Sequence, residues 1–122
     1  MTDRTTSATA ASVPPSRTGL WLDARTLAMH RLMVEKIRRE PALFARLGDA
    51  LVRWQQTAAP GTRSYLAAWQ ALVDQGPEAC FAVALEESDR GQVMRSCSPF
   101  QGVLTNAERW AFLKSWSTHE AV

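Results

Sequence analysis

Proline and glycine constrain the fold of this chain more than any other feature, because they divide everything after residue 18 into short segments. Proline lacks the amide hydrogen that a helix interior needs, and it disfavours helical geometry in the residue before it. The breaks stand at Pro41, Pro60, Gly76–Pro77 and Pro99. Each of them is expected to end one element or to begin the next.

Between these breaks, apolar residues recur at three- and four-residue steps, which is the spacing of an amphipathic α-helix. The clearest stripe follows Pro41 and comprises Leu43, Leu47, Ala50, Leu51 and Trp54. Asp23 is expected to cap a first helix that runs through Arg39, and Ser64 to cap a third. Residues 77–87 are apolar almost all round, which predicts a buried fourth helix.

Two further helices are expected after residue 87. Ser88 is placed to begin a short fifth helix, which Ser98–Pro99 ends. Thr105 and Glu108 have the Thr-x-x-Glu spacing of a capping box, which predicts a sixth helix from Asn106 to about Trp116. No segment is a convincing strand, so the sequence predicts an all-α fold: a compact bundle of about five to six short helices.

Length and composition favour one helical domain, residues 19–122, because 46% of the 122 residues are hydrophobic. Residues 1–18 differ, being rich in Thr, Ser, Ala and Pro and poor in large apolar side chains. Such a segment has too little apolar surface to repay the entropy of ordering, so we expect a disordered, flexible tail. A segment that folds on a partner is the alternative.

The sequence also indicates the cellular compartment in which the protein is expected. The longest apolar run has about seven residues, against the ~20 that a membrane helix needs, and residues 1–7 carry no apolar signal core. Cys80 and Cys97 lack the spacing of a zinc site, and we expect reduced thiols. The expectation is a cytoplasmic protein without membrane contact.

The sequence predicts no catalytic, cofactor or metal site. No glycine-rich phosphate loop is present. His30 is the one histidine within the helical body, and a structural or solvated side chain is the simpler interpretation than an acid–base catalyst. Cys97 and Ser98 lie at a helix end with no base visible nearby in the sequence, so capping and packing explain them better than nucleophilic attack.

Basic residues gather on the first helix, where Arg31 and Arg38 share a face and Arg39 is displaced from them. These three residues are the candidate contacts for nucleic acid. Acidic residues are interspersed, and the net charge is only +2, so a salt-bridged face in solvent is the competing interpretation.

The segment Ser98–Leu104 is the best candidate for a partner-binding site. It carries Phe100, Val103 and Leu104 in a loop that Pro99 and Gly102 stiffen, and Trp110 follows on the next helix. Aromatic anchors in rigid loops often dominate the energy of protein interfaces. Two interpretations stay open at this point: the loop contacts a partner, or Phe100 and Leu104 plug the end of the bundle.

Three blocks, Leu27–Leu32, Gly76–Ala79 and Ser98–Leu104, resemble those of small uncharacterised bacterial helical proteins, which are similar to the smaller partners of toxin–antitoxin-like or defence-like gene pairs. The resemblance covers most of residues 20–116. It implies a protein partner, such as a toxin encoded nearby, and it transfers no catalytic residue. The leading hypothesis is therefore a non-enzymatic helical protein-interaction module, antitoxin-like in its role. The alternative is a helical DNA-binding transcriptional regulator that uses the first helix.

Overall fold

The structure is a computed structural model that describes residues 17–121, with side chains described for residues 23–116. Within that range it contains helices and no strand, so the all-α prediction is confirmed. The elements in chain order are α1 (Arg17–Arg39), η1 (Pro41–Phe44), α2 (Ala45–Gln55), α3 (Pro60–Gln75), α4 (Pro77–Ala84), α5 (Asp89–Ser96), η2 (Pro99–Val103) and α6 (Asn106–Ala121), where η denotes a 3₁₀-helix.

The predicted breaks all mark helix ends, whereas two of the predicted caps are wrong. α1 already begins at Arg17, so Asp23 lies inside it, and α3 begins at Pro60, four residues before Ser64. Residues 1–16 of the predicted tail lie outside the described residues, and residues 17 and 18 belong to α1. The fourth helix ends at Ala84, short of residue 87.

The other caps form as predicted. The Ser88 hydroxyl accepts a hydrogen bond from the Gly91 amide at 3.0 Å, which begins α5. Both halves of the capping box are present at the start of α6: the Thr105 amide donates to the Glu108 carboxylate at 2.7 Å, and the Glu108 amide donates to the Thr105 hydroxyl at 3.1 Å.

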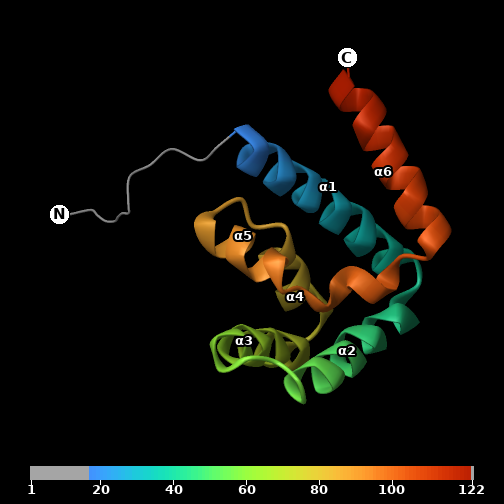
Figure 1. Cartoon of the computed structure of the whole chain (residues 1–122). Coiled ribbons are helices and arrows are strands. Elements are labelled where there is room, and N and C mark those ends of the chain that lie inside the picture. The colour runs from blue at the N-terminus through green and yellow to red at the C-terminus, as the bar shows by residue number, and fades with distance from the viewer. Residues whose placement is uncertain (1–16, 122) are drawn as a thin grey trace.

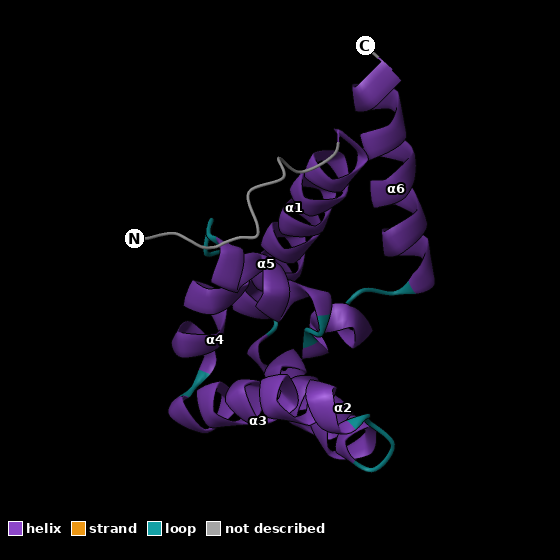
Figure 2. Ribbon diagram, turned by 60° about the vertical axis from the view of Figure 1, so that its left-hand side comes forward, coloured by secondary structure: helices purple, strands orange, loops and turns teal. Residues whose placement is uncertain are grey.

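The helices α1 to α5 form one body, from which α6 projects (Figure 1). α2 and α3 pack against each other on one side of the body, and α1, α4 and α5 pack together on the other. η2 runs between them and contacts both α1 and α2. α6 begins beside the C-terminal end of α1 and extends away from the remaining helices, which a second view also shows (Figure 2).

One hydrophobic core is formed by side chains from all of the helices α1, α2, α3, α4 and α5, together with η2. Its largest fully buried apolar side chains are Met33, Ile37, Leu47, Leu51, Leu66, Trp69, Phe100 and Val103. The indole of Trp69 satisfies its buried N–H by donating to the Met94 carbonyl at 2.9 Å. None of the apolar α6 side chains that the structure describes is among the core residues or the hydrophobic residues packed against them. The core is therefore complete without α6.

A buried arginine fixes α5 against α4 and α1. The Arg95 guanidinium donates to the Ala84 and Glu86 carbonyls at 3.2 and 2.7 Å, and it pairs with Asp23 of α1 at 3.2 Å. Gly91 lies directly over this contact, since a Cβ built there would stand 2.0 Å from the Glu86 carbonyl oxygen. The close approach of the two backbones requires glycine at this position.

We therefore expect Gly91→Ala to lower the free energy of unfolding by about 1–3 kcal/mol, because the obstructing atom is a backbone oxygen that also binds Arg95. Gly48→Ala is the matched control. Gly48 lies inside α2 with open space around it, and alanine there is expected to raise stability by about 0.5–1 kcal/mol. Urea unfolding of both variants measures the difference, and equal effects at the two positions would contradict the tight contact at Gly91.

Candidate protein-binding site

Two of the three arginines predicted to contact nucleic acid are engaged in ion pairs. Arg31 pairs with Glu87 at 3.4 Å, and Arg38 pairs with Glu78 at 3.1 Å. Arg39 is exposed and has no ion-pair partner among the residues that the structure describes. These exposed pairs contribute little to stability, but they lower the positive potential of α1. The salt-bridged face is therefore what the structure shows for Arg31 and Arg38.

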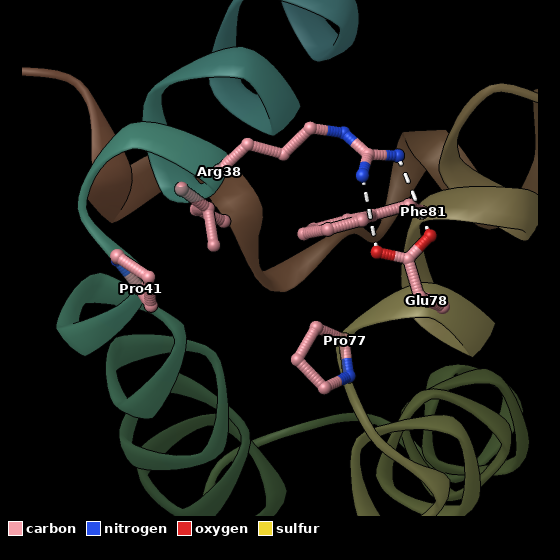
Figure 3. A pocket seen from close by; sticks show the side chains of 6 residues that line it. Arg38, Pro41, Pro77, Glu78 and Phe81 are labelled. Atoms are coloured by element: carbon pink, nitrogen blue, oxygen red, sulfur yellow. Dashed lines mark hydrogen bonds and ion pairs between the residues drawn. The ribbon is translucent and has the colours of Figure 1, made fainter.

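The Arg38–Glu78 pair forms the rim of a pocket between the end of α1 and the start of α4 (Figure 3). Both guanidinium nitrogens donate to the carboxylate, at 3.1 and 3.4 Å, and the guanidinium carbon stands 4.8 Å from the centre of the Phe81 ring. The pocket has a volume of about 300 Å³ and is lined by Ile37, Arg38, Pro41, Pro77, Glu78 and Phe81. We call it the Phe81 pocket.

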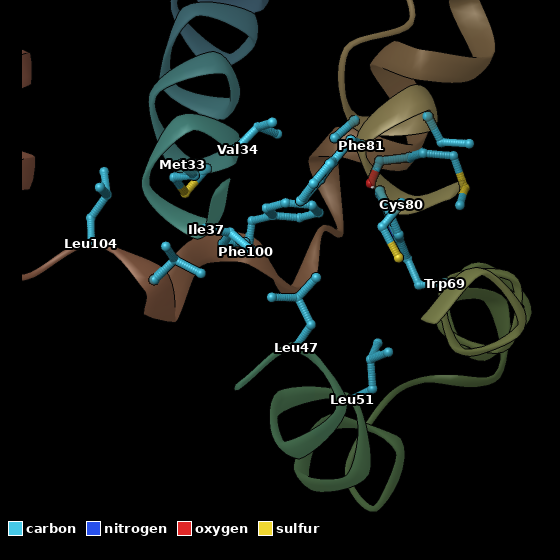
Figure 4. Close-up of a cluster of buried hydrophobic side chains, with 14 of the residues drawn as sticks. Met33, Val34, Ile37, Leu47, Leu51, Trp69, Cys80, Phe81, Phe100 and Leu104 are labelled. Carbon is cyan, nitrogen blue, oxygen red and sulfur yellow. Dashed lines mark hydrogen bonds between the residues drawn. The ribbon is translucent and has the colours of Figure 1, made fainter. Parts of the chain in front are cut away.

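The loop predicted to bind a partner is instead part of the core, which corrects the interface interpretation for three residues. Phe100 and Val103 are 0% exposed, and Leu104 is 8% exposed. Figure 4 shows Phe100 pointing into the cluster between Ile37, Phe81 and Leu47. The physical reason is that η2 passes between α1 and α2, in the middle of the body. Burial of the three large apolar side chains in this position stabilises the fold more than their exposure on a loop would. Phe100 and Leu104 are core side chains, as the second interpretation expects, but η2 lies between α1 and α2 and not at the end of the bundle.

Trp110 is the exception among the predicted anchors, because it lies on α6 and is 72% exposed. Hydrogen bonds tie the first turn of α6 to the body. The buried Lys36 ammonium donates to the Val103 carbonyl at 3.0 Å and to Glu108 at 2.6 Å, and Arg109 donates to the Gln101 carbonyl at 2.6 Å. The hydrogen bonds from Lys36 and from the Thr105 amide lower the pKa of Glu108 to about 2, so the carboxylate stays charged at neutral pH.

A groove of about 290 Å³ separates α6 from α1, and we call it the α1–α6 groove. Its lining residues are Leu32, Lys36, Arg39, Leu104, Glu108, Ala111, Phe112 and Ser115. The four α6 members recur at three- and four-residue steps, so they occupy one face of that helix. Trp110 is about 160° away from Phe112 around the helix axis, so it faces away from the groove.

His30 and Ser98, which the sequence does not connect, form a buried hydrogen-bonded pair. The Nδ1–H of His30 donates to the Thr26 carbonyl at 2.8 Å, which leaves Nε2 to accept a hydrogen bond from the Ser98 hydroxyl at 2.8 Å. The two residues have the geometry of a base and a nucleophile, but they are 3% and 0% exposed, so a substrate cannot reach them in this conformation. Burial lowers the pKa of His30 to about 4, so it is neutral at pH 7.

The cysteines are free thiols, Cys80 buried and Cys97 half-buried. Burial raises the pKa of Cys80 to about 11 and also raises that of Cys97, so neither is a thiolate at neutral pH. Across the described residues, no three histidine, cysteine, aspartate or glutamate side chains gather as a metal site would require. Nor does any described helix have the length and apolar character needed to cross a membrane.

The groove residues Leu32 and Phe112 were not singled out from the sequence, which identified only Trp110 on the sixth helix as a candidate anchor. The spacing of Phe112 and Trp116 is the local signal that was available, since their rings stack with centroids 6.1 Å apart. The Lys36–Glu108 and His30–Ser98 contacts span 72 and 68 residues, and no local pattern indicates them.

No model of a known protein family, no curated protein and no solved structure matches this chain.

Replacing Phe100 with alanine is expected to lower the free energy of unfolding by about 3–5 kcal/mol, because the ring is fully buried and leaves a cavity. The control is Trp110→Ala, which removes an aromatic side chain of α6 that is mostly in solvent and is expected to change stability by about 0.5 kcal/mol or less. Thermal and urea unfolding measure both. Similar effects at the two positions would contradict the assignment of the loop to the core.

Acid is expected to destabilise the protein through His30. Its pKa in the folded state, about 4, lies below the ordinary value of 6.5, so the unfolded chain binds the proton more readily. Stability is therefore present above pH 6.5 and falls as the pH drops from 6.5 to 4, by up to about 3 kcal/mol. Urea unfolding at pH 7, 5.5 and 4 measures it. His30→Gln is expected to flatten this part of the profile, and an unchanged slope in the variant would exclude His30 as its cause.

Proposed function

We propose that this chain is a non-enzymatic protein-interaction module that holds an amphipathic helix of another protein in the α1–α6 groove. The resemblance to the smaller partners of toxin–antitoxin-like gene pairs supports a partner encoded by a neighbouring gene and a bacterial, cytoplasmic setting. The proposal replaces the loop anchors Phe100, Val103 and Leu104 with the groove residues, because the loop is buried.

The observation that carries this proposal is the position of α6. On α6, Trp110 is 72% exposed, and Phe112, Leu113 and Trp116 are half-buried. None of these four large apolar side chains belongs to the core. Apolar surface that a fold does not bury is characteristic of a surface that binds a partner. An isolated helix of 16 residues is also only marginally stable in water, so packing against a partner would stabilise α6 as well.

The chemistry of the groove favours a helix with an acidic residue. The α1–α6 groove lies between two helices. An amphipathic helix of a partner can place its apolar residues, at three- and four-residue spacing, into such a groove. Leu32, Leu104 and Phe112 supply apolar contact area. The charge of Lys36 is balanced by Glu108, whereas Arg39, at the edge of the groove, is paired with no described carboxylate. A carboxylate on the partner can therefore form an ion pair with Arg39.

The alternative, DNA binding through α1, has less support. Arg31 and Arg38 already pair with carboxylates, so each would have to exchange Glu87 or Glu78 for a phosphate. Arg39 is the one of the three predicted contacts without such a partner in the described part of the chain. Steep loss of duplex DNA binding with added salt, abolished by Arg39→Glu, would restore this hypothesis.

Site-specific photo-cross-linking in the native host tests the proposal. A photoreactive residue at Leu32 is expected to capture one partner protein, whereas the same residue at Val52, an exposed position on α2, is expected to capture none in common with it. Capture that does not depend on position, or capture of this chain alone from Leu32, would contradict the proposed site.

The captured partner is then purified and its dissociation constant measured against matched variants. Leu32→Asp and Arg39→Glu are each expected to weaken binding about tenfold or more, as loss of an interface anchor does. The controls are Val52→Asp and Arg53→Glu, which make the same changes at exposed positions of α2 and are expected to leave affinity unchanged. Equal losses in variants and controls would show that the partner binds elsewhere.

A further inference from the structure

The α1–α6 groove carries its positive charge at one end. The Lys36 ammonium binds the Glu108 carboxylate and the Val103 carbonyl, so the start of α6 lies beside the last turns of α1 (Figure 1). Arg39, three residues after Lys36, therefore lines the groove at the end where α6 begins, together with Leu104. Both cations among the lining residues belong to this end of the groove.

The remaining length of the groove is mainly apolar. Leu32 lies about two turns before Arg39 on α1, a distance of about 10 Å along the helix. On the other wall, Ala111 and Phe112 follow Glu108 by about one turn of α6. The groove thus connects a positively charged end to an apolar channel, which is the polarity of a site for an amphiphilic anion.

We propose that the α1–α6 groove binds a small amphiphilic carboxylate, an unbranched fatty acid of medium chain length, with its carboxylate at Arg39 and its hydrocarbon chain over Leu32 and Phe112. This binding needs no second protein, so it does not rest on the proposed function. One consequence does rest on it: a fatty acid in the groove excludes a partner helix from the same place and so regulates that interaction.

Arg39 is the residue that recognises the carboxylate. Its side chain is exposed, lines the groove and is paired with no described carboxylate. The neighbouring Glu40 is not among the lining residues. Glu108 is the one carboxylate that lines the groove, and Lys36 and the Thr105 amide already bind it. A guanidinium group binds a carboxylate through two parallel hydrogen bonds, which fixes the head group at this end.

The volume of the groove suits one hydrocarbon chain. Its volume of about 290 Å³ is at the small end of the range for ligand pockets, which are commonly about 300–1,000 Å³. A water molecule occupies about 30 Å³ and a methylene group is of similar size, so the groove has room for roughly ten such groups. A mostly apolar lining with a few placed polar groups is also the usual composition of a small-molecule site.

Isothermal titration calorimetry of the purified chain with decanoate tests the inference, at concentrations below those at which decanoate forms micelles. One binding site per chain is expected. Affinity is expected to rise about two- to fourfold for each methylene from hexanoate to decanoate, the upper value being that for full burial, and to level off for longer chains. The matched control is 1-decanol, which lacks the charge and is expected to bind at least tenfold more weakly.

Two exposed positions of the groove test where the ligand lies. Arg39→Gln is expected to weaken decanoate binding at least tenfold and to leave 1-decanol binding unchanged, whereas Arg53→Gln, on the exposed side of α2, is expected to alter neither. Ala111→Phe fills the apolar channel and is expected to weaken both ligands at least tenfold. Its control is Ala67→Phe, at an exposed position of α3. Circular dichroism verifies that all four variants stay folded.

Four outcomes would overturn the inference: no binding of decanoate at millimolar concentration, affinity that does not change with chain length, 1-decanol binding as tightly as decanoate, and equal losses in Arg39→Gln and Arg53→Gln. A missing decanoate site leaves the photo-cross-linking from Leu32 unaffected, and a missing protein partner leaves the calorimetry unaffected. The two proposals therefore fail separately.

Discussion

The rest of the structure depends on the packing of the buried Phe100 ring. This ring lies within 5.6, 5.8 and 6.4 Å of the rings of His30, Trp69 and Phe81, measured between centroids, and these residues belong to α1, α3 and α4. Aromatic pairs in tilted and edge-on arrangements add about 0.5–1.5 kcal/mol each beyond their buried area. One side chain from a short 3₁₀-helix thus connects three helices that are distant in the sequence. Ser98 assists it, because its hydroxyl accepts from the Phe100 amide while it binds His30.

The same segment determines where α6 begins and how it is oriented. Val103 and Leu104 are anchored in or against the core, and the capping box follows at once. The Lys36 ammonium donates to both the Val103 carbonyl and the Glu108 carboxylate, so one group holds the end of η2 and the first turn of α6 together. Because the ammonium is almost fully buried, losing either partner would leave a poorly solvated charge, which is costly. The Lys36–Glu108 pair thus fixes the end of the groove at which α6 begins.

Local chemistry was sufficient to predict the helices, and insufficient to predict which apolar residues face solvent. Ser88 and the Thr105–Glu108 pair were identified as caps because their partners lie three residues away. Ser64 was not a cap, since Pro60 is an equally good first residue and begins α3 earlier. Phe100 and Trp110 carry similar local signals, yet one is buried and the other exposed. That difference arises from contacts across 70 and 31 residues, to His30 and Trp69, which no sequence window contains.

The length of α6 makes the position of its far end sensitive to the geometry of its first turn. Its 16 residues extend about 24 Å at 1.5 Å per residue, so a change of about 10° in direction at Thr105 displaces the far end by about 4 Å. The width of the α1–α6 groove therefore depends on the backbone at Thr105 and on the Lys36–Glu108 ion pair. A molecule that alters the geometry of this first turn would therefore change the width of the groove most at the end farthest from Thr105.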